Sequence, residues 1–278
     1  MVTLITGASG FLGSKIVDSI LNDADYQSLL ADGLILLGHS EKRADFLRRE
    51  TGIPVYVGDI SNGFFLENIF RKNKIKRIIH SAALKYVSVS NQNAVSAIEV
   101  NVLGSYFLVK LAIKYDIKFA VGISTDKALL PANVYGMTKN LMEHIFIESG
   151  YTIVSGVNFF GSSGSVLDIW KKQIDQKKPL TITDKKCVRY FIDVNEMSRL
   201  VLSSFEKKGM VYPDYTIQIN MGDLLNAFMD YYDYHDYEET GLLDGEKLVE
   251  NLDSNIICKP SSNELLLSLI EAWDKSYS

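Results

Sequence analysis

The chain has little of what marks disulfide-linked or metal-binding proteins. Its 278 residues include two cysteines, Cys187 and Cys258, which lie far apart in the sequence and form no Cys-x-x-Cys motif. A structural disulfide or a zinc site is therefore not expected. The protein is expected in a reducing compartment. The four histidines show no metal-ligand spacing, so no metal site is predicted.

The chain also lacks an excess of positive charge and long apolar runs. A net charge of −5 leaves no basic surface for nucleic acid or an anionic membrane, although a nucleotide needs only local positive charge. No uninterrupted apolar run reaches the roughly 18 residues of a membrane span. The first predicted strand begins at Val2, which leaves no room for a signal peptide. These absences predict a soluble, cytoplasmic protein without a membrane or nucleic-acid partner.

What the sequence does contain is an alternation of short apolar runs and helical patterns. The runs predict strands at Val2–Thr6, Leu34–Leu37, Val55–Val57, Arg77–His80, Phe119–Ile123 and Ile153–Val157. The longest helical pattern between them runs from about Ala94 to Tyr115. Strands that alternate with helices predict an α/β fold with a doubly wound parallel sheet.

The pattern loosens after Asn158. Helices are expected at Val166–Gln176 and Glu196–Phe205, and a strand at Val188–Ile192. The tail from about residue 208 is acidic with shorter patterns, and its tyrosine-rich stretch is given no role. The predicted domains are therefore 1–157 plus 190–207, which would bind a nucleotide, and 158–189 plus 208–278, a smaller substrate lobe.

A glycine-rich turn follows the first predicted strand and opens a helix. Gly7-x-x-Gly10-x-x-Gly13 allows a tight turn and close approach of a pyrophosphate to helix N–H groups, so a dinucleotide site is predicted rather than a purely structural turn. The residues expected to line it are Gly7, Ser9, Gly10, Phe11, Leu12 and Gly13.

The tip of the second predicted strand bears on the choice of cofactor. An NAD site usually has an acidic residue there, but this chain has Ser40 followed by Lys42 and Arg43, which suit the 2′-phosphate of NADP. Glu41 could take the NAD role after a shift of one residue, and the two cations could simply be solvated. NADP is favoured and NAD is the alternative. Asp59 and Ile60 are expected near the adenine, with a helix N-cap as the alternative for Asp59.

The segment after the fourth predicted strand is expected beside the nicotinamide. Ala82 and Ala83 would let the backbone approach the ribose, and Lys85 could reach cofactor or substrate, or only solvent. Asn101, on the helix that follows, is expected to shape this part of the site, and a buried structural role fits it equally.

The stretch Ser124–Lys139 carries the strongest catalytic pattern. Tyr135 and Lys139 are four residues apart, so on a helix they share a face, and the lysine could lower the phenol pKa for proton transfer during carbinol oxidation. Thr125, Asp126 and Lys127 follow an apolar strand, where sites form in parallel sheets. An acid beside a base is needed to eliminate water, whereas a simple alcohol dehydrogenase does not need it; a surface ion pair is the alternative.

Taken together, these residues resemble a known family. Ser124-Thr125-Asp126-Lys127-Ala128 with Tyr135 and Lys139 is similar to the inverting UDP-N-acetylglucosamine 4,6-dehydratases (5-epimerases), which are extended short-chain dehydrogenase/reductases of polysaccharide biosynthesis. The G-x-x-G-x-x-G spacing is that of the extended group. Further similar blocks are Ala82–Val87, Asn101–Gly104, Gly161–Val166, Arg189–Phe191 and Gly245–Glu250.

The resemblance implies a role for each matching residue. Tyr135, assisted by Lys139, would take the sugar O4 proton while the C4 hydride passes to a tightly bound, recycled NADP. Lys127 would remove the C5 proton and Asp126 would protonate the departing O6, with Thr125 beside them. Reprotonation of C5 on the opposite face would give an L-configured 4-keto-6-deoxy sugar. The UDP-sugar would contact Lys85, Asn158, Val166, Thr181, Arg189 and Glu246.

The chain departs from the family pattern at Ser163 and at Leu243-Asp244, where relatives carry cations, so the diphosphate would depend on Arg189, Lys185 or Lys186. Alternative functions are a UDP-sugar 4-epimerase, a 4-keto-sugar reductase and, more distantly, a non-catalytic NADP-binding sensor. A homo-oligomer is expected by analogy with this fold.

Overall fold

The computed structural model describes residues 2–162 and 164–277 of the chain. They form two compact units, Met1–Gly156 with Val194–Pro213 and Val157–Asp193 with Asp214–Ser278. The chain thus crosses between the units after residues 156, 193 and 213. The sequence-based boundaries were 157, 189 and 207.

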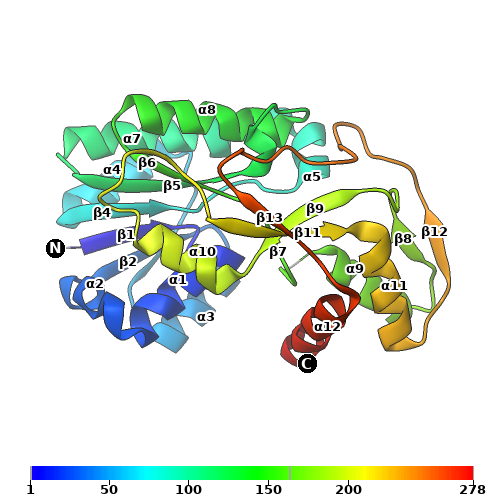
Figure 1. The fold of residues 1–278 in the computed structure, drawn as a ribbon. Helices are drawn as coiled ribbons and strands as arrows, with labels where there is room; N and C mark the ends of the chain where they lie inside the picture. The colour runs from blue at the N-terminus through cyan, green and yellow to red at the C-terminus, as the bar shows by residue number, and fades with distance from the viewer. Residues whose placement is uncertain (1, 163, 278) are drawn as a thin grey trace. The chain divides into compact units, whose positions relative to one another are not determined.

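A seven-stranded parallel sheet forms the centre of the first unit. The strand order is β10-β6-β5-β4-β1-β2-β3, and every neighbouring pair is parallel (Figure 1). The strands are β1 (Val2–Thr6), β2 (Leu34–Gly38), β3 (Val55–Val57), β4 (Ile75–His80), β5 (Phe119–Thr125), β6 (Thr152–Gly156) and β10 (Gly209–Val211). The chain moves outward from β1 in both directions, which is the doubly wound arrangement that the sequence predicted.

Helices cover both faces of this sheet. Helices α7 and α8 lie together on one face with α4, while α1 packs against α10 on the other (Figure 1). The helices of the unit are α1 (Phe11–Asn22), α2 (Gln27–Asp32), α3 (Glu41–Thr51), α4 (Gly63–Lys72), α5 (Val87–Gln92), α6 (Ala94–Ala97), α7 (Gly104–Lys114), α8 (Val134–Glu148) and α10 (Val194–Leu202), with 3₁₀ turns η1 (Ala24–Tyr26) and η3 (Asp126–Ala128). Buried Leu, Ile and Phe side chains from β1, β4, α4, α7 and α8 form one core.

The helix expected from Ala94 to Tyr115 is not a uniform α-helix. Between α6 and α7 it contains a π-helical segment, η2 (Ile98–Leu103), with Asn101 buried at its centre. Among the described residues, Ala94–Lys114 is also the one helix long and apolar enough to cross a membrane, and 44% of its most apolar window is buried. A core helix passes the same test, so this feature is weak evidence for a membrane span.

The second unit has two small sheets and its own apolar core. The sheets are β13-β11-β9-β7 and β12-β8. The elements are β7 (Asn158–Phe159), α9 (Val166–Asp175), β8 (Leu180–Ile182), β9 (Val188–Ile192), β11 (Tyr215–Asn220), α11 (Met221–Tyr232), β12 (Tyr237–Glu239), β13 (Ile257–Pro260) and α12 (Asn263–Tyr277). Trp170, Phe228 and Trp273 pack in its centre.

The tail contains more regular structure than its sequence suggested. Helices α11 and α12 are 12 and 15 residues long. In α11, seven residues are buried, and the exposed Asp223, Asn226 and Asp230 fall at i, i+3 and i+7 on one face. The tyrosine-rich stretch is packed: Tyr232 donates to Asp274, and Tyr234 donates to the Lys178 carbonyl at 3.0 Å.

Candidate active site

The glycine turn after β1 is shaped so that no side chain fits at two of its positions. Gly7 has φ +66°, and a Cβ there would lie 2.6 Å from the backbone of Ser81 and Ala82. A Cβ on Gly13 would lie 2.2 Å from the Gly7 carbonyl oxygen. Gly10 is the N-cap of α1, and no side chain caps that helix. The first N–H groups of α1 therefore suit a phosphate group.

The residues expected around the adenosine half of a dinucleotide differ in exposure and in their hydrogen bonds. Ser40 is the N-cap of α3 and accepts from the Arg43 backbone N–H at 3.4 Å, while the side chains of Lys42 and Arg43 are exposed. Asp59 accepts from the backbone and hydroxyl of Ser61, both at 2.8 Å.

The N-cap alternative for Asp59 is wrong, because Asn62 caps α4 by accepting from the Phe65 N–H. Ile60 is 5% exposed and belongs to the core of the first unit.

Asn101 fixes the turn after β4. Its amide oxygen accepts from the Leu84 N–H at 2.8 Å, and its amide nitrogen donates to the Leu84 carbonyl and to Thr138 Oγ1, each at 3.0 Å. Its side chain thus shapes the Ala82–Ala83–Leu84 backbone. Lys85 is exposed, with its ammonium 5.0 Å from the centre of the Tyr86 ring.

Helix α8 carries Tyr135 and Lys139 on one face. Asn133 caps the helix by accepting from the Gly136 N–H at 2.8 Å, which sets where the helix begins. Lys139 is 3% exposed, and its ammonium donates to the Ile123 carbonyl at 2.6 Å. Burial lowers the pKa of Lys139 to about 8, and the charge of Glu143 opposes that fall.

The expected lowering of the tyrosine pKa is not found in the protein alone. Burial raises the pKa of Tyr135, the negative charge of Asp126 raises it further, and a hydrogen bond with Thr125 opposes both. The Lys139 ammonium is held by the end of β5 instead, at the Ile123 carbonyl. The spacing of four therefore predicted the shared helix face correctly but not the direction in which the pKa of Tyr135 shifts.

Asp126 and Lys127 form a buried pair where β5 ends. The Lys127 ammonium lies 3.2 Å from Asp126 Oδ1, and the Thr125 hydroxyl donates to the same oxygen at 2.8 Å. The side chain of Asp126 is 1% exposed and that of Lys127 15%. The second carboxylate oxygen, Asp126 Oδ2, is buried and has no hydrogen-bond partner in the described protein. The surface-pair alternative is wrong, because both side chains are largely out of solvent.

Two of the residues expected to bind a sugar nucleotide meet in the second unit. Arg189 donates to Glu246 Oε1 at 2.7 Å, with their side chains 12% and 19% exposed. Thr183 donates to the same oxygen at 3.2 Å. This pair joins β9 to the segment around Glu246.

The other expected substrate contacts in this unit are held by their own neighbours. Asn158 donates to the Tyr190 carbonyl at 2.9 Å. Thr181 bonds Gln173 through both its backbone N–H and its hydroxyl, and Val166 opens α9. Lys185 donates to Tyr237 at 2.8 Å and pairs with Glu239, and Ser163 lies outside the described residues.

Comparison with known proteins identifies the family. A family model described as "Polysaccharide biosynthesis protein" matches residues 3–263. The chain belongs to this family.

Individual relatives of this chain carry different names. Capsular polysaccharide biosynthesis protein CapD of Staphylococcus aureus is 32% identical over 72% of this chain and 35% of its own length. A UDP-glucose 4-epimerase of Rickettsia canadensis is 28% identical over 91% of this chain and 77% of its own. An inverting UDP-N-acetylglucosamine 4,6-dehydratase of Campylobacter jejuni is 28% identical over 73% and 63%. A relative from Methanocaldococcus jannaschii is named an uncharacterized membrane protein, at 28% identity over 90% of this chain and 79% of its own.

CapD and the probable polysaccharide biosynthesis protein EpsC of Bacillus subtilis are much longer than this chain, which spans 35% and 44% of them. Among solved structures, Pen of Bacillus thuringiensis matches with TM-score 0.82 and 26% identity over 89% of this chain and 79% of that one. DesIV of Streptomyces venezuelae, a dTDP-glucose 4,6-dehydratase with NAD bound, matches with TM-score 0.84 and 19% identity over 99% and 97%. The fold is that of the extended short-chain dehydrogenase/reductases.

This fold implies a nicotinamide cofactor, and the residues present fit one. The glycine turn has no room for a side chain at Gly7 or Gly13, and Gly10 leaves the start of α1 uncapped. Among residues 2–162 and 164–277, no group of three or more metal-ligating side chains could hold a metal ion.

Two polar residues, the partly exposed Glu143 on α8 and the buried His80 on β4, were missed from the sequence. Glu143 continues the helix face of Tyr135 and Lys139, and burial raises its pKa while the charge of Lys139 opposes the rise. His80, at the end of β4, is 1% exposed and bonded through both ring nitrogens. The spacing Tyr-x-x-x-Lys-x-x-x-Glu was a signal for Glu143; His80 looked like the end of an apolar strand.

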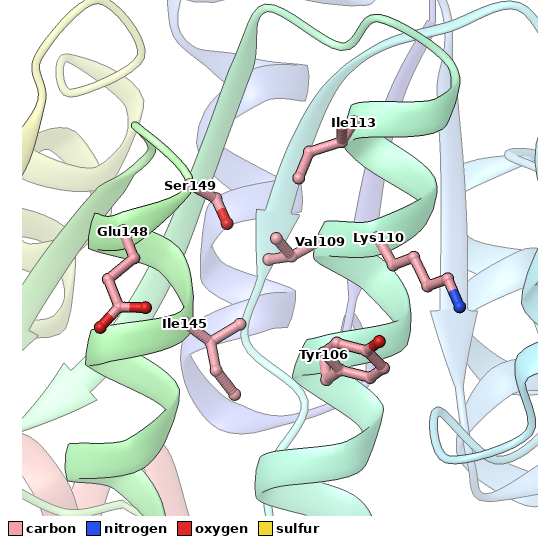
Figure 2. A pocket seen from close by; sticks show the side chains of 7 residues that line it. All are labelled: Tyr106, Val109, Lys110, Ile113, Ile145, Glu148 and Ser149. Atoms are coloured by element: carbon pink, nitrogen blue, oxygen red, sulfur yellow. The ribbon is translucent and has the colours of Figure 1, made fainter.

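A pocket of about 360 Å³ lies between α7 and the second half of α8 (Figure 2). It is lined by Tyr106, Val109, Lys110, Ile113, Ile145, Glu148 and Ser149. Tyr135 lies at the opposite end of α8, so this pocket is separate from the catalytic residues.

Proposed function

We propose that the chain is a UDP-N-acetylglucosamine 4,6-dehydratase that inverts C5. One observation carries this proposal: the buried Asp126–Lys127 pair, with a carboxylate oxygen left without a partner, lies at the end of the strand beside Tyr135. An unsatisfied buried acceptor costs about 1–3 kcal/mol, and a substrate hydroxyl would satisfy it. A 4-epimerase or ketoreductase has no use for this second acid/base pair.

The residues divide the proposed chemistry into two proton transfers. Tyr135, as its phenolate, takes the proton of the sugar O4, and the Lys139 ammonium stabilises that phenolate before the transfer. When bound, a nicotinamide would supply the hydride acceptor for C4 and the hydride donor for C6. The resulting 4-keto group acidifies C5–H, and Lys127 in its neutral form takes that proton. Asp126 in its acid form donates to O6, which leaves as water.

Inversion requires that solvent deliver the new C5 proton from the face opposite Lys127, and Tyr135 releases the O4 proton to solvent to become a phenolate again. The sugar then ends as a 4-keto-6-deoxy hexose that has lost one water in total. Lys127 and Asp126 share one hydrogen-bonded contact at 3.2 Å, so a proton can pass between them to restore both groups for the next turnover.

UDP recognition is assigned to the second unit and to Lys85. Arg189 is the proposed diphosphate contact, with Glu246 orienting its guanidinium through the 2.7 Å ion pair. Asn158, Val166 and Thr181 complete the proposed sugar-nucleotide contacts.

NADP is the proposed cofactor because exposed Lys42 and Arg43 follow the tip of β2 and could pair with a 2′-phosphate. NAD is the competing choice, and the related structure of DesIV has NAD bound. Comparing the dissociation constants of NADPH and NADH for the wild type and Arg43→Gln decides between them. Loss of NADPH affinity alone supports the assignment, and equal losses for both contradict it.

A second copy of the chain is the proposed partner, through the exposed apolar side chains of the α6–α8 region. Val95, Ile113, Met137 and Leu141 are each at least half exposed there, and Ile113 also lines the pocket of Figure 2. The proposed location is the cytoplasm, where nucleotide sugars would be available.

The proposal is tested by proton NMR of the protein with UDP-N-acetylglucosamine in D₂O. A new C6 methyl signal, deuterium at C5 and ring couplings of an L-sugar are expected from the wild type. Lys127→Ala should lose both dehydration and C5 exchange while keeping NADPH affinity.

The second candidate, a UDP-sugar 4-epimerase, is favoured by the Rickettsia relative, which this chain matches over 91% of its length. A UDP-N-acetylgalactosamine product without any methyl signal would replace the first proposal with this one.

A further inference from the structure

His80 lies at the centre of a buried chain of hydrogen bonds in the first unit. Its Nδ1 is 2.7 Å from Thr6 Oγ1, at the end of β1, and its Nε2 is 2.9 Å from Ser105 Oγ, on α7. The imidazole also stacks on Phe146 of α8, with ring planes 3° apart and centres 5.8 Å apart. The side chain therefore touches a strand and two helices around the proposed cofactor site.

The hydrogen bonds of this series through His80 all run in one direction. Ser105 donates its single hydroxyl proton to the Asn101 carbonyl at 2.6 Å, so toward His80 it accepts. His80 Nε2 therefore carries the ring proton, and Nδ1 accepts from the Thr6 hydroxyl. Thr6 in turn accepts the Ala82 N–H at 3.4 Å. The order is Ala82 N–H to Thr6, Thr6 to His80, His80 to Ser105, and Ser105 to Asn101.

A second branch continues from Asn101 to the catalytic helix. The Asn101 side chain holds Leu84 and donates to Thr138 Oγ1, and Thr138 donates to the Tyr135 carbonyl at 2.9 Å. The π-helical segment η2 is what brings Asn101 into this position. One buried path therefore joins the backbone beside Gly7 to the backbone of Tyr135.

We propose that His80 is a positioning residue that holds the turn of Ala82 and Ala83 in register with the helix that carries Tyr135. This inference rests on the proposed function only in naming Tyr135 as the reacting group. Its physical content is that the chain of hydrogen bonds, rather than the packing of the ring, sets the shape of the cofactor turn.

Two substitutions separate bonding from packing. His80→Phe keeps a ring that can stack on Phe146 but removes both hydrogen bonds. His80→Asn removes most of the ring but keeps an oxygen near the position of Nδ1, where Thr6 can still donate. We expect the NADPH dissociation constant to rise about tenfold in His80→Phe, which is the size of one net hydrogen bond, and to stay within about threefold of wild type in His80→Asn.

The melting temperature of each variant without cofactor gives the independent readout. His80→Asn should melt lower than His80→Phe, because it leaves a cavity in the core. The order of cofactor affinity is thus expected to be the reverse of the order of stability. If affinity instead follows stability, or if all three proteins bind NADPH equally, His80 is only a packing residue and the inference fails.

A matched control comes from the other end of the same bond. Thr6→Val has nearly the same shape as threonine, removes the donor to His80 and the acceptor of Ala82, and should match His80→Phe in NADPH affinity. Turnover of UDP-N-acetylglucosamine by the wild type is measured in parallel. Absence of turnover counts against the proposed function, whereas the NADPH comparison decides the role of His80 by itself.

Discussion

Lys139 should make the protein more stable as the pH rises above 8. Burial lowers its pKa to about 8, whereas the side chain has a value of 10.5 in an unfolded chain. Between these two values the unfolded chain binds a proton that the folded protein does not, so the free energy of unfolding increases with pH. Full deprotonation corresponds to about 3.4 kcal/mol, from about 1.4 kcal/mol per pH unit.

The measurement compares the wild type with Lys139→Met, which has a similar length and no charge. Urea unfolding at pH 7.0 and pH 9.5 gives the free energy of unfolding of each protein at both values. Groups that titrate identically in both proteins cancel in the difference. The wild type should gain about 2 kcal/mol relative to the variant over this interval, since most of the titration from 8 to 10.5 falls within it.

A surface lysine gives the control. Lys118 is 65% exposed and pairs with Asp116, so Lys118→Met should leave the pH dependence almost unchanged. A flat difference between wild type and Lys139→Met would show that the ammonium is solvated in the folded protein. The burial of Lys139 beneath the end of β5 would then be wrong.

Three further outcomes follow from the described contacts. Burial lowers the pKa of His80 to about 3 from 6.5, so below pH 6.5 the unfolded chain binds a proton that the folded protein does not. Urea unfolding should therefore show that the wild type loses about 1.4 kcal/mol of stability per pH unit below 6.5 relative to His80→Asn. Parallel pH profiles of the two proteins would contradict this. Gly13→Ala should abolish NADPH binding or folding, because its Cβ would lie 2.2 Å from a carbonyl oxygen. Gly63→Ala, whose Cβ would have its nearest contact at 3.4 Å, should bind NADPH normally. Titration calorimetry distinguishes the two, and tight binding by Gly13→Ala would refute the role of the glycine turn in holding the cofactor. Arg189→Ala should lower the free energy of unfolding by about 2 kcal/mol in the wild-type background, and by less in a protein that already carries Glu246→Gln. Equal losses in the two backgrounds of this double-mutant cycle would show that the ion pair contributes nothing to stability.

The doubly wound sheet could be predicted from the sequence because local signals repeat along it. Short apolar runs, each ending in small or polar residues, marked six strands of the sheet. β10 (Gly209–Val211) was missed because it lies in the tail, where no strand was predicted. Strand ends shifted by one or two residues, as at β5, which continues to Thr125. The same logic placed Asp126 and Lys127 at a strand end.

What the sequence could not supply was the environment of each group. The direction of the Tyr135 pKa depends on its burial and on the charge of Asp126, and neither follows from a spacing of four. Likewise, the bonds of His80 reach residues 74 and 25 positions away, which no local pattern encodes. The contact between Arg189 and Glu246 spans 57 residues and was not predicted, because each residue was expected only as a separate substrate contact.

The π-helical segment Ile98–Leu103 has a consequence for how this chain can change during evolution. A π-helical turn holds one residue more than an α-helical turn, so deletion of one residue there would let the whole stretch become a regular α-helix. The α-helical parts on either side would keep their faces, but the residues of the wide turn itself, Asn101 among them, would be displaced. Asn101 and Ser105 could then no longer face Leu84 and His80 together. Surface loops of this protein can lengthen and shorten freely, but the length of this buried helix should be held constant.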